Sequence, residues 1–224
     1  MCGRFAFYSP AEAAAQLFGT PASAPVEPRY NIAPTQYVAA IRVTDSDERE
    51  LLMLRWGLVP SWARDPAIGN RMINARAETV AEKPAFRAAY KSRRCLVLAD
   101  GFYEWHTAGG VKTPYYISAS DGEPFAFAAL WERWQNRETD DVLQTATIVT
   151  AEANDFMKQL HHRMPVVLKP ASAARWLSGD TELLHETNTT TPKMRAWPVS
   201  RTVNNARNEG EGLIDAEGAA LVEV

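Results

Sequence analysis

The chain has 224 residues, of which 46% are hydrophobic and 23% are charged, and its net charge is −3. This length fits one large domain or two small ones, and the hydrophobic content supports a packed core rather than disorder. No apolar stretch approaches the ~20 residues of a membrane span, and the N-terminus lacks a signal-peptide pattern. Two cysteines without CxxC spacing argue against a disulfide framework or a cysteine-rich zinc site. We therefore expect a cytoplasmic protein without membrane partners.

The first residues carry an unusual pair of nucleophiles. Removal of Met1 would leave Cys2 with an α-amine and a thiol on adjacent carbons. Their reference pKa values lie near ~8 and ~8.5, so both groups are partly reactive at neutral pH. Such a 1,2-aminothiol condenses with an aldehyde to an imine, and the thiol then closes a thiazolidine ring. A frayed chain end is the alternative, but Phe5 and Phe7 alternate with small or polar residues as in a strand.

Further along the chain, turn and helix signals separate several strand-like segments. Ser9 to Glu12 reads as a capping box with a proline at the first helical position, and Gly19 is placed to end that helix. We expect further helices from Pro84, over 151–160 with Thr150 as its cap, and over 170–177, and a polar loop over 187–191. The expected later strands are 37–43, 51–58, 95–99, 102–105, 115–117, 124–131, 146–150 and 166–168. This order favours a single α+β domain over 1–224, with a mostly antiparallel, curved or barrel-like sheet and short peripheral helices.

Glu104 is a candidate proton carrier. In a strand it shares a face with Phe102, while Tyr103 and Trp105 face the other way. If that face is dry, burial raises the carboxyl pKa toward a value useful for general acid/base catalysis. An exposed strand carboxylate is the alternative, which the four residues by themselves favour slightly.

Two adjacent histidines close the expected 151–160 helix. The side chains of His161 and His162 should diverge, so they cannot chelate one metal ion, and no HExxH spacing accompanies them. We therefore expect no metal. One of the two could donate a proton, with its basicity raised by the negative end of the helix, or it could be a surface histidine.

A second polar cluster surrounds Asn74 and Arg76, which alternate in an extended segment and so lie on one side. Together they suit a phosphate or sugar oxygen. Between residues 71 and 94 there are seven basic residues and two acidic ones. This stretch is either a phosphate-binding face or a solvated helix face, and its composition alone favours the second.

Six motifs then occur in a fixed order along the chain. They are Met1-Cys2-Gly3-Arg4-Phe5, Arg29-Tyr30-Asn31-Ile32-Ala33-Pro34, Arg55 to Trp62, Ile73 to Thr79, Ala99 to Trp105 and Arg163-Met164-Pro165-Val166. Their sequence and spacing resemble the SOS response-associated peptidase (SRAP) family of abasic-site processing proteins, over about residues 2–208.

The resemblance implies a monomeric sensor that binds single-stranded DNA containing abasic sites, uses no cofactor and is nucleoid-associated when bound. Cys2 would form a thiazolidine crosslink with the ring-opened aldehyde of the abasic sugar. Glu104 corresponds to the family's acid/base carboxylate, His161 to its active-site histidine and Asn74 to the residue that holds the sugar. The positions that the resemblance assigns to DNA binding are Arg4, Asn31, Pro34, Trp62, Arg76, Trp105 and Arg163.

One position departs from the family pattern. Many members carry His-Asp-Arg where this chain has His161-His162-Arg163, which puts the rate of crosslink release in question more than its formation. Two other functions stay open at this point. A thiol-dependent peptidase could act on the chain's own terminus or on other proteins, and a non-catalytic module could bind single-stranded nucleic acid reversibly.

Overall fold

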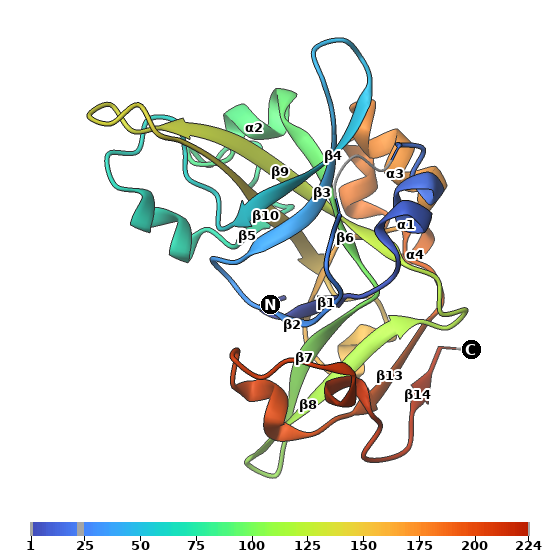
Figure 1. The fold of residues 1–224 in the computed structure, drawn as a ribbon. Helices are drawn as coiled ribbons and strands as arrows, with labels where there is room; N and C mark the ends of the chain where they lie inside the picture. Colours follow the sequence, from blue (N-terminus) through green and yellow to red (C-terminus); the bar gives the residue numbers. More distant parts are fainter. Residues whose placement is uncertain (1, 22–24, 224) are drawn as a thin grey trace.

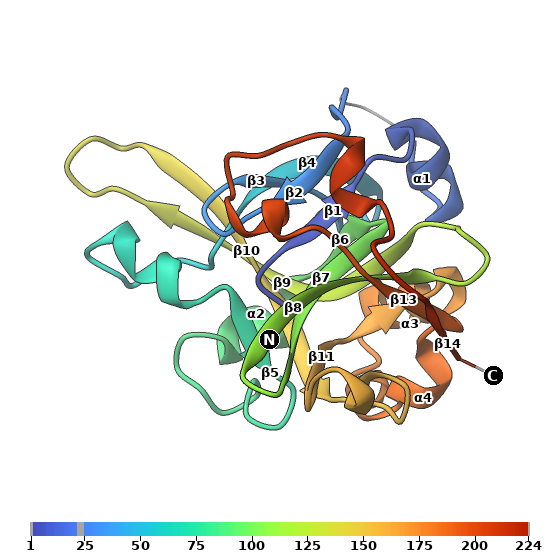
Figure 2. The same cartoon turned by 90° about the horizontal axis from the view of Figure 1, so that it is seen from below.

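The computed structural model describes residues 2–21 and 25–223. The described chain forms two sheets that pack against each other, with short helices on the outside (Figures 1 and 2). The six-stranded sheet has the order β14-β13-β8-β7-β1-β2. Its strands are β1 (Phe5–Phe7), β2 (Arg29–Ile32), β7 (Gly101–Ala108), β8 (Val111–Ala119), β13 (Met194–Pro198) and β14 (Leu221–Val222).

The second sheet closes on itself. Its order is β11-β10-β4-β3-β6-β9-β12, with β5 paired to β10. An additional antiparallel pairing of β9 with β10 joins the two ends of the run β10-β4-β3-β6-β9, which is therefore a barrel. The strands are β3 (Tyr37–Val43), β4 (Arg49–Trp56), β5 (Asn74–Arg76), β6 (Arg94–Ala99), β9 (Phe125–Gln135), β10 (Val142–Glu152), β11 (Arg163–Pro165) and β12 (Val167–Leu168). The expected α+β fold with a mostly antiparallel, barrel-like sheet is confirmed.

An aromatic cluster joins β1 to the barrel. The Phe5 ring meets Trp56 edge-on at 5.2 Å and Phe127 at 5.6 Å between ring centroids. All three rings are buried, and burying each side chain of this kind contributes about 1.5–3 kcal/mol. The first strand is therefore held in the core, and the alternative of a frayed chain end is wrong for the residues from Cys2 onward.

Short helices cover the barrel and the edges of the six-stranded sheet. Four are α-helical and the others are 3₁₀ turns among the described residues. They are α1 (Ala11–Leu17), η1 (Pro66–Arg71), α2 (Arg87–Ser92), η2 (Met157–Gln159), α3 (Pro170–Leu177), η3 (Glu182–His185), α4 (Thr187–Thr190), η4 (Arg201–Asn204) and η5 (Glu211–Ile214). No helix in residues 2–21 or 25–223 is both long and apolar enough to cross a bilayer.

Local helix signals failed where tertiary pairing offered better partners. The helix expected over 151–160 is wrong, because β10 continues to Glu152 and pairs with both β5 and β11. The expected capping box is also wrong, because the Ser9 hydroxyl donates to Asp100 at 2.5 Å and Pro10 is the N-cap of α1. The expected loop over 187–191 contains the single turn α4.

Candidate active site

The pairing of β1 with β7 brings the N-terminal cysteine to Glu104. Phe5 is opposite Phe102 in this antiparallel ladder, and the Tyr103 N–H donates to the Arg4 carbonyl at 2.9 Å. Since the two strands run in opposite directions, the residues before Arg4 pass alongside Glu104. Cys2 is fully buried there.

Glu104 faces the interior of the protein. It is 3% exposed, on the same face of β7 as the buried Phe102, whereas Tyr103 and Trp105 belong to a second cluster on the opposite face. The predicted orientation is confirmed, and the exposed-carboxylate alternative is wrong. Desolvation by burial raises the carboxyl pKa of Glu104, against the lowering effect of Lys112 and His162. Glu104 is thus a carboxyl group poised to exchange a proton.

The Cys2 thiol is held in its protonated form. Burial raises its pKa well above the ordinary value, and the nearby Glu104 carboxylate adds to this effect. A thiolate is the reactive nucleophile, so a reaction at this sulfur requires a group that takes the thiol proton. Glu104 is placed for that exchange.

Asn74 ties the barrel to the same end of the chain. Its Nδ2 donates to the Cys2 backbone carbonyl at 2.7 Å. Strand β5, which carries Asn74, pairs in parallel with β10 through Ile148. Asn74 Oδ1 is buried and has no hydrogen-bond partner among the described residues. A buried acceptor of this kind is costly to leave unpaired, so it is suited to receiving a hydrogen bond from a bound hydroxyl.

His161 is a further neighbour of Glu104 and comes from the segment between η2 and β11. Its Nδ1 is 3.7 Å from Glu104 Oε2, and it lies 3.0 Å from the backbone nitrogen and 3.1 Å from the carbonyl oxygen of Arg163. One tautomer accepts a hydrogen bond from that N–H and the other donates to that carbonyl. Burial lowers the pKa of His161, so the expected increase of basicity from a helix end is wrong, and only the 3₁₀ turn η2 forms in the expected helical segment. The lowered pKa favours the neutral imidazole, a form that both accepts and donates a proton.

The two histidine side chains do not diverge as expected. The rings of His161 and His162 stack at 4.4 Å between centroids, 27° apart. The backbone bends between η2 and β11, so neither helical nor strand geometry separates the two rings. Within the described chain no group of three or more His, Cys, Asp or Glu residues is placed to hold a metal ion, and the stacked pair has no set of further ligands around it.

The half-buried Arg4 is hydrogen-bonded to the fully buried Asn31. Arg4 Nη1 donates to Asn31 Oδ1 and to the Val203 carbonyl, both at 2.7 Å. The Asn31 side chain is fully buried, and its Nδ2 donates to carbonyls of the segment after η4, at 3.0 Å for Asn205 and 2.8 Å for Asn208. A direct DNA contact through the Asn31 side chain does not fit this burial. The geometry instead makes Asn31 the residue that positions Arg4.

The other two predicted arginines differ in exposure. Arg163 forms a bidentate ion pair with Glu78, with N–O distances of 2.5 and 3.0 Å, and donates to the Thr150 carbonyl at 2.7 Å. Its side chain is only 12% exposed, and these bonds connect β11, which carries Arg163, to β10 and to the turn after β5. Arg76 is exposed at the end of β5, two residues from Asn74, where it can meet an anion directly.

The predicted stacking residues lie at the surface in different settings. Trp62 is 55% exposed, and Pro34 is half-buried in the turn after β2. Trp105 is half-buried, and its indole N–H donates to Asn204 Oδ1 at 2.7 Å. Trp62 thus offers the more accessible aromatic face.

Lys112 is a residue of this site that the sequence patterns missed. It is opposite Thr107 in the hairpin of β7 and β8, and its Nζ lies 5.9 Å from the centre of the Trp105 ring. Its charge lowers the pKa of both Glu104 and His161, after larger effects of burial. The turn signal at Gly109 and Gly110 marks the hairpin and could have predicted this placement.

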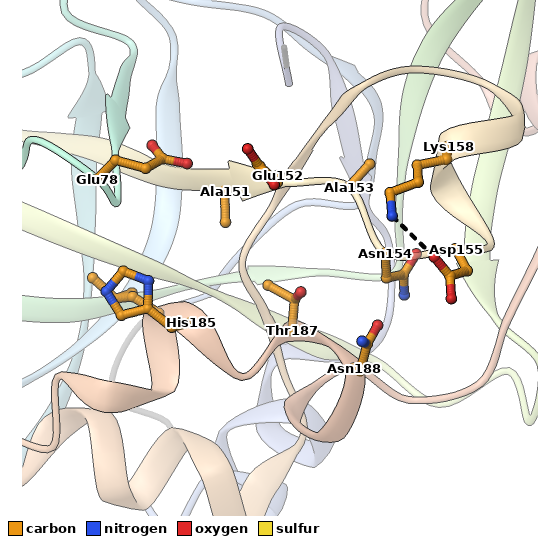
Figure 3. A pocket seen from close by; sticks show the side chains of 11 residues that line it. Glu78, Ala151, Glu152, Ala153, Asn154, Asp155, Lys158, His185, Thr187 and Asn188 are labelled. Atoms are coloured by element: carbon orange, nitrogen blue, oxygen red, sulfur yellow. Dashed lines mark hydrogen bonds and ion pairs between the residues drawn. The ribbon is translucent and has the colours of Figure 1, made fainter.

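A separate hollow lies beside the Arg163–Glu78 pair. Figure 3 shows Glu78 and Glu152 on one side of it and His185 and Thr187 on the other, with the Lys158–Asp155 ion pair at one end. Its volume is about 280 Å³. None of the predicted catalytic side chains lines this hollow, so the candidate active site is distinct from it.

Fold and site together define a class: a sheet-rich, barrel-containing domain with a buried N-terminal thiol next to a carboxyl and an imidazole. The chain matches the family described as SOS response associated peptidase (SRAP) over residues 1–206. It is 42% identical to the abasic site processing protein YoaM of Bacillus subtilis, over 97% of this chain and 99% of the relative. The chain belongs to the SRAP family.

Two further relatives extend this similarity. The abasic site processing protein YedK of Escherichia coli is 33% identical over 96% of this chain and 99% of its own length. A crystal structure of a protein from Bacteroides thetaiotaomicron superposes with a TM-score of 0.83 at 25% identity, covering 96% of this chain and 99% of the other. That crystal structure thus shares the fold described above over nearly the whole chain.

Proposed function

We propose that this protein, once Met1 is removed, captures abasic sites in single-stranded DNA as a covalent thiazolidine at Cys2. The observation that supports this proposal most is that Cys2, Glu104, Asn74 and His161 come together just before the start of β1, from four separate segments of the chain. Several relatives are named abasic site processing proteins. That is the class of lesion whose ring-opened sugar presents an aldehyde to a 1,2-aminothiol.

The first step is imine formation. The α-amine of Cys2 attacks C1′ of the ring-opened sugar, and the aldehyde oxygen leaves as water with both amine protons. The bond from Asn74 to the Cys2 carbonyl supports this step, because it holds the amine-bearing residue in one position. Orientation of two reacting groups is among the largest contributions an active site makes.

The second step is ring closure. The thiol sulfur of Cys2 adds to the imine carbon, and its proton ends on the nitrogen. Glu104 carries that proton, since burial raises the pKa of its carboxyl and so strengthens it as a proton acceptor. Proton transfer by a positioned side chain contributes about 10²–10⁴-fold to a rate.

His161 assists the opening and closing of the sugar ring. Its imidazole, 3.7 Å from Glu104, exchanges protons with the furanose oxygen in both directions. In the reverse direction the same group promotes release of the crosslink. Arg4, Arg76 and the exposed face of Trp62 provide the cationic and stacking contacts that single strands require.

The test is a denaturing gel of the protein, with Met1 removed, and an oligonucleotide bearing one abasic site. We expect a shifted band that resists denaturation, and its loss in Cys2→Ser. A peptide map should locate the adduct at the N-terminus, with a mass equal to protein plus oligonucleotide minus one water. A crosslink of equal yield in Cys2→Ser, or in a form that retains Met1, would overturn the proposal.

A further inference from the structure

The cations around α2 are not used by the site described above. Lys83, Arg87, Lys91 and Arg94 are together called the α2 ridge here. The first three are exposed and Arg94 is half-buried. No member of the α2 ridge makes an ion pair with a carboxylate in the part of the chain that the structure describes. Their charge is therefore available to an external anion.

Helical geometry aligns the exposed members. The Arg87 N–H donates to the Lys83 carbonyl at 2.9 Å, so the first helical turn begins at Lys83, ahead of α2 itself. Lys83, Arg87 and Lys91 are four residues apart, and this spacing puts them on one face at intervals of about 6 Å along the axis. A regular row of cations suits a polyanion with regularly spaced charges.

Arg94 lines a cavity next to this row of cations. The cavity, of about 570 Å³, is lined by Arg87, Lys91 and Arg94 and by no carboxylate of the described chain. Arg94 Nη1 donates to the carbonyls of Tyr90 and Lys91, at 2.7 and 3.2 Å. Its Nε is buried with no partner among the described residues. Desolvation of this guanidinium lowers its pKa, and an anion in the cavity would relieve that cost.

The α2 ridge continues directly from the candidate active site. The Thr79 N–H donates to the Arg76 carbonyl and the Lys83 N–H to the Thr79 carbonyl, at 3.1 and 3.0 Å. Consecutive hydrogen-bonded turns thus connect Arg76, at the end of the strand that bears Asn74, with Lys83. Figure 2 shows β5 and α2 on the same side of the molecule. A strand that passes Arg76 on leaving the Cys2 site reaches the α2 ridge next.

We infer that the α2 ridge binds the phosphate backbone of the DNA strand that flanks the captured lesion, lengthening the footprint beyond Arg76. The inference rests on the proposed function for the position of the strand. The row's continuity with Arg76 and its even spacing favour a nucleic-acid backbone over an acidic peptide, whose carboxylates follow no fixed interval.

The experiment measures fluorescence anisotropy with undamaged single strands, so that no covalent step enters. The variant is Arg87→Glu/Lys91→Glu, and the matched control is Lys169→Glu/Lys193→Glu, which makes the same charge change at two exposed lysines beside α3 and β13. Each is titrated with an oligonucleotide of about 8 and one of about 25 nucleotides, shorter and longer than a compact single-strand footprint.

We expect the ridge variant to bind the long strand about tenfold more weakly, with little change for the short one. The salt slope on the long strand should fall by about 1.4, since each single-strand phosphate contact contributes about 0.7. Unchanged affinity and slope, or an equal change in the control, would overturn the inference. So would binding of polyglutamate by the wild type as tightly as DNA of equal charge.

A parallel crosslinking assay separates the two proposals. With a short abasic oligonucleotide, the ridge variant should form the Cys2 adduct as fast as the wild type. If the wild type forms no adduct while anisotropy still shows a ridge-dependent footprint, the covalent function fails and the phosphate-binding inference stands.

Discussion

Asn74 donates a hydrogen bond of 2.7 Å to the backbone carbonyl of Cys2, across 72 positions of sequence. The bond fixes the nucleophilic residue from the barrel side, whereas β7 fixes it from the six-stranded sheet. Cys2 is therefore held by both sheets at once. Chain ends are usually the least ordered part of a domain, so this restraint is a property that the proposed chemistry requires.

Asn74→Ala should slow crosslink formation about fivefold or more, because a neutral hydrogen bond of this kind contributes about 1 kcal/mol. The rate is measured by quenching the reaction with an abasic oligonucleotide at timed intervals. Asn70→Ala is the control, since Asn70 is exposed and bonds only the Arg55 side chain among the contacts described. Equal rates for the wild type and Asn74→Ala would contradict a positioning role.

Glu104→Gln should slow ring closure by about 10²–10⁴-fold while stabilising the fold near neutral pH. Burial raises the carboxyl pKa of Glu104, so the folded state binds more protons than the unfolded state between the ordinary pKa near 4.3 and the raised value. Stability is full below that window and declines as pH rises through it. The glutamine has no such loss.

Thermal unfolding at pH 4 and pH 8 measures this effect. At pH 8 we expect Glu104→Gln to melt above the wild type, because the glutamine carries no buried charge. Each gain of about 1 kcal/mol corresponds to a rise of about 2–4 °C at this chain length. At pH 4 the difference should vanish. A variant that melts lower than the wild type at both values would indicate that the Glu104 carboxylate stabilises the fold.

His161→Gln should reduce both formation and release of the crosslink, and it should remove an acid sensitivity of the wild type. Burial lowers the pKa of His161, so the unfolded state binds the extra proton first as pH falls below the ordinary value of about 6.5. Stability is present above that value and is lost as pH falls toward the lowered one. Denaturant titrations at pH 7.5 and 5.5 should show a smaller loss for His161→Gln.

His162→Asp tests the departure from the family pattern. It removes the ring stacked on His161 at 4.4 Å and puts a negative charge beside the imidazole. That charge favours the protonated form, so the pH dependence of crosslink release should move to higher pH. His162→Asn, which loses the ring without gaining the charge, is the control. A shift of equal size in both variants would show that stacking rather than charge sets the profile.

Trp62→Ala should weaken single-strand binding by about 1–3 kcal/mol, the usual contribution of one stacked base. Because this side chain is 55% exposed, the melting temperature should change little. Trp62→Phe keeps an aromatic face and should retain most of the affinity. A loss of affinity in Trp62→Phe as large as in Trp62→Ala would assign the effect to the indole N–H instead of stacking.

Local patterns were sufficient for much of the fold. The bounds of β3 at 37–43 and of α3 at 170–177 agree with the expected segments, because a strand-like run that ends at a turn and a proline at the helix start are properties of neighbouring residues. Period-two alternation set the face of β7 on which Glu104 lies. Local signals failed at Thr150, where two partner strands far apart in sequence compete with helix formation.

The features of the candidate site also divide into those that the sequence predicted and those that only the tertiary structure decided. The reactive chemistry of Cys2 follows from its position after Met1, and its electrophile was implied by the order of motifs. Only the tertiary structure decided that Glu104 is buried, that the buried Asn31 accepts a hydrogen bond from Arg4, and that the His161 and His162 rings stack. Solvent exclusion and backbone pairing depend on contacts between segments tens of residues apart. Neighbouring residues determine periodicity and covalent chemistry, whereas contacts between distant segments determine the pKa values and the orientations of the reactive side chains.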